Sequence, residues 1–175
     1  GWCAVNYGAF PYDETSWIVR EFKGEQTIAL QAGWNWMSSY ISEFDTDGLT
    51  WLKEDLSGQV GAQIKNNLHA VTNYEQGWFG SLTNVSVKEM YKVKVTADAS
   101  FTHEGSYVNY DECEIVLYPG WNYISYPVNE EMNLIDALAK LQPSSDDIIK
   151  RQDATATYAF GAWRSAFTLT PGQGY

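Results

Sequence analysis

Two stretches of this chain carry the same sequence pattern, and this internal similarity constrains the fold more than any other feature. Residues 28–41 read IALQAGWNWMSSYI, and residues 115–128 read IVLYPGWNYISYPV. Both stretches contain Gly-Trp-Asn, a Ser at the third position after the Asn, and apolar residues at matching places. Similarity at a fixed spacing is the signature of a chain built from copies of one supersecondary unit. We therefore expect two tandem copies of a small module.

The similarity continues downstream in the same order. LTWLKEDL at 49–56 corresponds to LIDALAKL at 134–141, and the Ile-Lys pair at 64–65 recurs at 149–150. The residues that we take to define the fold in both copies are Gly33, Trp34, Asn35, Tyr74, Gly120, Trp121, Asn122 and Tyr158. The predicted boundaries are 1–27 for N-terminal strands leading into the first copy, 28–96 for that copy, 97–114 for a linking turn and strand, and 115–175 for the second copy.

Each copy is predicted to contain several short strands and one short helix. A strand at 28–31 or 115–118 precedes a Gly turn and a strand that continues through the Gly-Trp-Asn core, and the leucine spacing that follows predicts a helix with one buried face. Asp45 or Asp47 is expected to cap the first helix, and Asn133 the second. Further strands are expected at 61–66, 69–75, 77–82 and 90–96, and at 147–152, 154–159 and 161–168. The predicted fold class is α+β, mostly β: two tandem copies of a small antiparallel sheet or partly open barrel, each with one short helix.

The second copy reaches the start of its last expected strand at Tyr175, which corresponds to Tyr91 of the first copy. Residues 171–175 read PGQGY, whereas the matching residues 87–91 of the first copy read VKEMY. The second copy is therefore either truncated or closes without that strand.

The Gly-Trp-Asn core together with the closing Pro-Gly-x-Gly-Tyr motif resembles a tandem repeat module of secreted and cell-surface proteins from anaerobic Gram-negative bacteria, including gut residents. The resemblance covers about 28–96 and 115–175, although the first copy departs from it at 87–91. It implies an extracellular or cell-surface location and brings no catalytic residues. Since no secretion signal follows Gly1, we expect a mature fragment of an exported protein.

Charge and hydropathy exclude two classes of partner. The formal net charge is -11, which disfavours nucleic acid and anionic membranes because both require clustered Lys and Arg. No apolar run approaches the roughly 18–20 residues that span a bilayer, so we expect no membrane insertion.

The two cysteines, Cys3 and Cys113, leave two states open. They form a disulfide if the protein is exported, or they are two buried free thiols.

Residues able to carry out catalysis are sparse. The two histidines, His69 and His103, lie in different contexts without metal-ligand spacing, and no nucleophile elbow is present. Adjacent carboxylates such as Asp146 and Asp147 are expected to be surface charge, because glycoside hydrolysis needs two carboxyl groups set apart across a cleft. We predict no catalytic residue, no metal site and no cofactor.

The aromatic surplus, with 8 Trp and 12 Tyr, allows two interpretations. Tryptophans of the repeat core are expected mainly to pack inside the fold, and the alternative is a platform on which sugars stack. The candidate ligand-binding residues are Trp51, Trp78 and Trp163; Trp51 is the best candidate for exposure because its counterpart is Asp136. The predicted function is a non-catalytic extracellular or cell-surface module for adhesion, spacing or protein interaction, with a surface glycan or another surface protein as partner. The alternative is a carbohydrate-binding module, and a glycoside hydrolase is a distant third.

Overall fold

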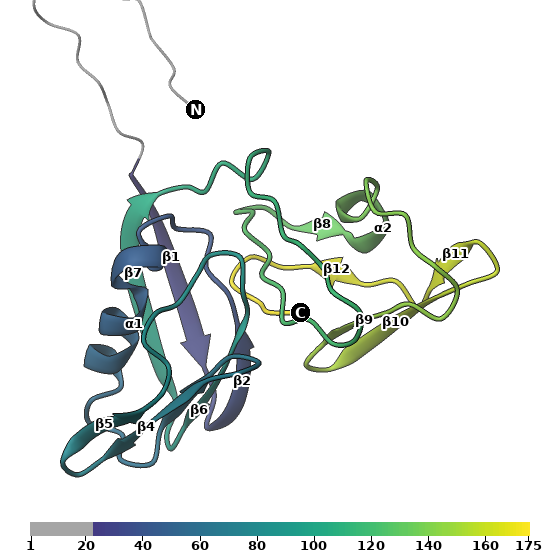
Figure 1. Cartoon of the computed structure of the whole chain (residues 1–175). Coiled ribbons are helices and arrows are strands. Elements are labelled where there is room, and N and C mark those ends of the chain that lie inside the picture. Colours follow the sequence, from purple (N-terminus) through teal and green to yellow (C-terminus); the bar gives the residue numbers. More distant parts are fainter. Residues whose placement is uncertain (1–22) are drawn as a thin grey trace, which may run out of the picture.

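The computed structural model describes residues 23–175, and the fold is α+β and mostly β, as predicted. Residues 1–22, which hold Cys3 and most of the segment 1–27 predicted to form N-terminal strands, lie outside the described residues. Figure 1 shows two lobes side by side. We call residues 23–106 the N-terminal unit and residues 115–175 the C-terminal unit. Each unit has its own cluster of buried apolar side chains.

The N-terminal unit contains a five-stranded antiparallel sheet in the order β2-β6-β3-β4-β5. Its strands are β2 (Gly33–Met37), β3 (Gln63–Lys65), β4 (Ala70–Tyr74), β5 (Gly77–Gly80) and β6 (Tyr91–Val95). A second, two-stranded sheet pairs β1 (Lys23–Leu30) with β7 (Ala99–Ser106). β1 alternates exposed and buried residues along its whole length, which is the pattern of a strand with one face on the core.

Helix α1 (Phe44–Asp55) packs on this core through the leucines that predicted it. Leu52 and Leu56 are almost fully buried, and Leu49 is buried beside them. The predicted cap is wrong, because the N-cap residue is Glu43 and its side chain makes no capping bond. Asp45 lies in the first turn and its carboxylate instead accepts a hydrogen bond from the amide of Val87, at 2.6 Å.

The C-terminal unit is smaller and its elements are shorter. It contains β8 (Met132–Asn133), α2 (Leu134–Ala137), β9 (Ile148–Arg151), β10 (Ala154–Ala159), β11 (Ala162–Arg164) and β12 (Thr168–Leu169). Asn133 caps α2 as predicted, since its side chain accepts a hydrogen bond from the amide of Ile135. The helix is only one turn long, and Leu138 and Leu141 lie beyond its end, so the predicted longer apolar face is not helical.

One predicted part of the C-terminal unit does not form regular structure. Residues 115–118 and the segment after Gly120 were expected to be strands, but neither is assigned as one. Strands are stabilised by neighbours, and in the N-terminal unit the matching segments pair with β7 and β6. Within the described residues of the C-terminal unit no such partner strands exist beside 115–124.

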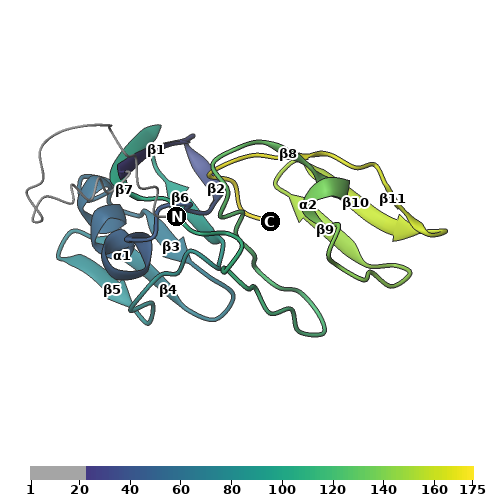
Figure 2. The same ribbon diagram turned by 90° about the horizontal axis from the view of Figure 1, so that it is seen from above.

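The two units lie side by side (Figure 2), and reciprocal hydrogen bonds join them. Ser38 of the N-terminal unit donates its amide to Gly172 at 2.9 Å and its hydroxyl to the carbonyl of Gln173 at 2.5 Å. Ser125 of the C-terminal unit bonds to the matching loop of the N-terminal unit, with its amide on Lys88 and its hydroxyl on the carbonyl of Val87. Both serines are buried, so each unit closes over the other.

The glutamine side chain of Gln152 adds a second link at this junction. Its amide oxygen accepts a bond from the amide of Trp36 at 3.0 Å, and its nitrogen donates to the carbonyl of Trp34 at 2.8 Å. Gln152 therefore binds two main-chain groups on the outer edge of β2. Among residues 23–175, β2 has a strand neighbour on the β6 side alone.

Candidate interaction groove

A groove lies in the C-terminal unit, beside its junction with the N-terminal unit. This groove has a volume of about 960 Å³. One wall is the segment 117–124 and the other is β9 with the turn before it. Side chains that line the groove include Tyr118, Trp121, Tyr123, Ile149, Trp163 and Tyr175.

The first wall is shaped by a hydrogen-bonded turn around Asn122. The side-chain oxygen of Asn122 accepts from the amide of Tyr118 at 2.9 Å, and its nitrogen donates to the carbonyls of Tyr118 and Gly120 at 2.7 and 3.0 Å. Gly120 has φ +99°, a left-handed conformation that favours glycine. The turn presents Trp121 at the rim of the groove.

The same turn occurs in the N-terminal unit. Asn35 accepts from the amide of Gln31 at 2.9 Å and donates to the carbonyls of Gln31 and Gly33 at 2.8 and 3.2 Å. Gly33 has φ +104°. The Gly and Asn of the repeated motif are therefore required by one turn geometry in both places.

The tryptophans of this motif are on the surface, which corrects the expectation that they pack in the core. Trp34 is 38% exposed and Trp121 is 62% exposed. The strand alternates, so the buried side chain of this segment is Met37, at 1% exposure. A lysine lies over one face of each indole: Lys65 is 4.5 Å from the Trp34 ring centre and Lys150 is 5.4 Å from the Trp121 ring centre.

The second wall of the groove is an edge strand. β9 pairs with β10 on one side, in a sheet of order β11-β10-β9. Ile149 points into the unit's core at 7% exposure, whereas Ile148 and Lys150 are exposed. An edge strand has main-chain N–H and C=O groups free to bond another strand.

Tyr175 closes one end of the groove. Its amide and carbonyl form a pair of hydrogen bonds with the carbonyl and amide of Ile124, at 2.9 and 2.8 Å. Its hydroxyl accepts a bond from the amide of Thr170 at 2.7 Å. Burial raises the pKa of the Tyr175 phenol above 10, so this group stays protonated across the physiological range.

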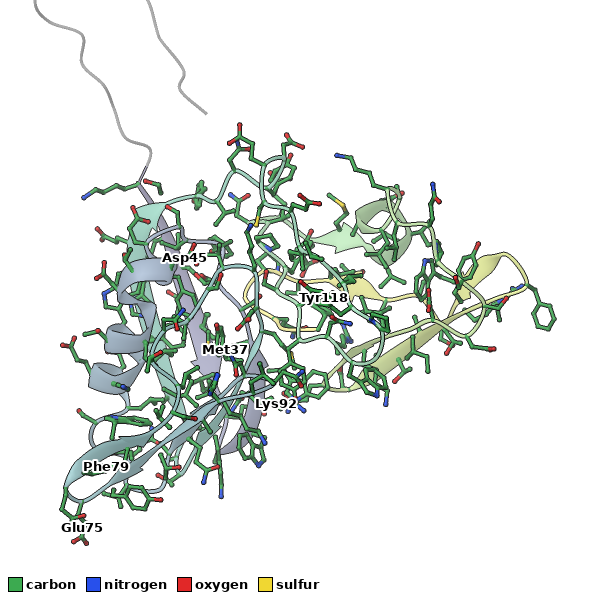
Figure 3. The ribbon with its side chains drawn as sticks, viewed as in Figure 1. Met37, Asp45, Glu75, Phe79, Lys92 and Tyr118 are labelled. Atoms are coloured by element: carbon green, nitrogen blue, oxygen red, sulfur yellow. The ribbon has the colours of Figure 1, made fainter. Side chains whose placement is uncertain are left out.

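Lys92 lies at the boundary between the two units, as Figure 3 shows. Its ammonium is 4.5 Å from the ring centre of Trp36 and 4.8 Å from that of Tyr123. One cation therefore contacts an aromatic ring from each unit. Tyr118, also labelled in Figure 3, is 70% exposed on the segment that forms the first wall.

The structure separates the three predicted ligand-binding tryptophans. Trp51 is half-buried and stacks on His103, with ring centres 4.3 Å apart. Trp78 is half-buried and donates its indole N–H to the carbonyl of Lys53 at 3.1 Å. Trp163 alone lines the groove, and it packs edge-on against Tyr158.

Tyr74 and Tyr158, both predicted to define the fold, do not occupy matching positions and differ by one residue in register. Tyr158 lies opposite Trp163, as Asn73 lies opposite Trp78. A shift of one position moves a side chain to the other face of its sheet. Tyr158 is accordingly half-buried, whereas Tyr74 is 52% exposed near the tip of the β4-β5 hairpin.

Groups suited to acid–base or metal chemistry do not gather in the groove. Its carboxylates, Asp146 and Asp147, are exposed in the turn before β9, where Asp147 accepts a bond from the amide of Ser144. No cluster of three or more metal-ligating side chains occurs among residues 23–175. The two walls instead offer main-chain edges, aromatic rings and apolar surface.

Cys113 is half-buried and packs on the core of the N-terminal unit. Burial raises the pKa of its thiol above 9. The other cysteine, Cys3, lies outside the described residues, and so does the predicted pairing of the two.

The sequence pattern did not identify Tyr118, Tyr123 and Tyr175 as groove residues. The signal for them was the strand at 90–96, which pairs with both β2 and β3 in the N-terminal unit and has no counterpart within residues 115–175. No family model, curated protein or solved structure matches this chain. Neither helix in the described part of the chain is long and apolar enough to cross a membrane.

Proposed function

We propose that this chain is a non-catalytic module of an exported, cell-surface protein, and that it acts by binding polypeptide. The observation that carries the proposal is the groove, whose walls are the segment 117–124 and the edge strand β9. Edges of this kind recognise extended peptides by main-chain hydrogen bonds, and neighbouring apolar pockets select the side chains. Of the three roles predicted from sequence, this favours protein interaction over adhesion or spacing.

We also propose that the two units are copies of one module. Three features that recur at matching positions support this: the Gly-Asn turn, the lysine over its tryptophan, and the closing tyrosine. Tyr91 and Tyr175 are both buried, and each hydroxyl accepts a bond from the amide five residues earlier, at 2.8 and 2.7 Å.

A synthetic peptide tests the interaction role directly. The sequence of residues 90–96 alternates apolar and polar side chains, and that strand fills the matching place in the N-terminal unit. Labelled peptide of this sequence is titrated with the protein and followed by fluorescence anisotropy. We expect saturable binding that weakens when Ile149→Asp puts a charge into the floor of the groove. A peptide with proline at both valine positions serves as the control, and equal binding of the two peptides would contradict the proposal.

Carbohydrate binding is the second candidate, and the exposed rings of Tyr118 and Trp121 favour it. Sugar C–H faces pack on such rings. Affinity electrophoresis in gels containing intact polysaccharides separates the two proposals. Retardation by a polysaccharide that Trp121→Ala abolishes would support the glycan role, and unchanged mobility in every gel would leave the peptide role as the better account.

A further inference from the structure

We propose that the groove is the seat of a β-hairpin that follows Tyr175 in the same polypeptide. Its first strand would run antiparallel to residues 120–124 and pair with β9 on its other side. This inference goes beyond the proposed function, because it makes the polypeptide in the groove a segment of the same chain. It rests on the claim that the two units are copies of one module.

The N-terminal unit shows the completed arrangement. There β6 lies between β2 and β3 and pairs with both. Tyr91 is opposite Met37 and Val93 is opposite both Asn35 and Ile64. The counterparts of β2 and β3 are the two walls of the groove, so the groove takes the place of β6.

Tyr175 fixes the position and direction of the incoming strand. Its two hydrogen bonds with Ile124 reproduce the pairing of Tyr91 with Met37. Continuing this register puts the next residue opposite Tyr123 and the one after it opposite Asn122. The strand joined to Tyr175 is therefore favoured over a separate chain, because it enters already aligned and its closure is intramolecular.

Differences in exposure indicate the second strand of the hairpin. Leu30 is 2% exposed because β1 pairs with β7, where Leu30 lies opposite Ala99. The matching residue, Leu117, is 47% exposed, and its neighbours Val116 and Tyr118 are 59% and 70% exposed. A strand equivalent to β7 would cover this segment, so the occupant is a hairpin like β6-β7.

The register also specifies the side chains of the first strand. Val93 and Val95 are at 0% and 1% exposure in the N-terminal core, so the second and fourth residues after Tyr175 should be apolar and β-branched. Lys92 lies on the outer face against Trp36 and Tyr123. The first and third residues after Tyr175 should therefore be polar, and a cationic side chain is favoured beside the exposed Trp121.

The decisive experiment extends the chain at Tyr175 with the sequence of residues 92–106. Amide hydrogen exchange is measured over 115–124 and 148–151, together with the midpoint of thermal unfolding. We expect exchange in both segments to slow by at least about 10-fold, because edge and loop amides become interior ladder positions. The control carries the same extension with proline at the positions of Val93 and Val95, and should show neither protection nor a higher midpoint.

A second arm adds the 92–106 sequence as a free peptide to the unextended chain. Protection by the joined segment and not by its proline control supports the inference. If the joined segment gives no protection while the free peptide protects the groove, the inference is wrong and the peptide-binding role stands. If neither protects these segments, the inference and the peptide-binding role are both wrong.

Discussion

Ser38 is the most informative single residue to change, because its hydroxyl joins the two units. The hydroxyl donates to the carbonyl of Gln173 at 2.5 Å and accepts from the amide of Tyr126 at 3.2 Å. Ser38 is fully buried, and Tyr126 is 4% exposed. Ser38→Ala removes the hydroxyl and leaves no group of similar polarity in reach.

The expected cost follows from what the two partners lose. The amide of Tyr126 makes no other hydrogen bond within residues 23–175, and a buried donor without a partner costs about 1–3 kcal/mol. Loss of the hydrogen bond to the carbonyl of Gln173 costs less free energy, because Gln173 is exposed. We expect Ser38→Ala to lower the free energy of unfolding by about 2–3 kcal/mol.

Urea denaturation followed by tryptophan fluorescence measures this change through the midpoint and slope of the transition. Ser145→Ala is the control, because Ser145 is exposed and should stay within about 0.5 kcal/mol of the parent. If Ser38→Ala also stays within that range, the hydroxyl does not join the units and the argument for reciprocal closure fails. A double variant with Ser125→Ala should be less destabilised than the sum of the two, since both changes open one junction.

Three further changes test other parts of the structure. Gly174→Ala should destabilise by about 1–3 kcal/mol in the same assay, because an added Cβ would lie 2.5 Å from the Cβ of Met90; an unchanged midpoint would mean that this contact relaxes freely. Asn122→Ala removes three hydrogen bonds of the turn and should lower the free energy of unfolding by about 1–2 kcal/mol. A loss below about 0.3 kcal/mol would count against the role of this turn. Burial lowers the pKa of the His103 imidazole below 6.5, although Asp55 lies 3.8 Å away. The unfolded chain therefore binds a proton before the folded chain does as the pH falls below 6.5, and the free energy of unfolding declines there. The variant His103→Gln should lose less stability than the parent between about pH 7.5 and 5, and equal losses would contradict this.

Local patterns predicted those elements whose neighbours lie close in sequence. The leucine spacing at 49–56 was sufficient for α1, because one helical face packs on the core whatever covers the rest. The Gly-Asn turns were predicted as turns because glycine chemistry is local, and the cap of α2 by Asn133 is local as well. The strands β3 to β5 and β9 to β11 follow from alternation between turn residues.

What sequence could not predict depends on partners distant along the chain. β1 pairs with β7 across a long separation, and residues 115–118 have the same pattern without such a strand beside them. Alternation assigns Trp34 to one of two faces but does not say which face meets the core. Only the structure shows that Met37 points inward and that Lys65 covers the indole outside.

The contacts at the junction explain why each unit has both a buried serine and the loop that ends at its tyrosine. Ser38 of the N-terminal unit donates hydrogen bonds to the loop at 171–175, and Ser125 of the C-terminal unit donates hydrogen bonds to the loop at 87–91. Each loop also positions its own tyrosine, so one loop stabilises the sheet of its unit and the edge of its neighbour. Either unit alone would lose the hydrogen bonds across the junction and expose side chains that the other unit now covers. A unit this small has little other buried surface to offset that loss. The pair of units, rather than the single unit, is therefore the smallest part of this chain that we expect to fold independently.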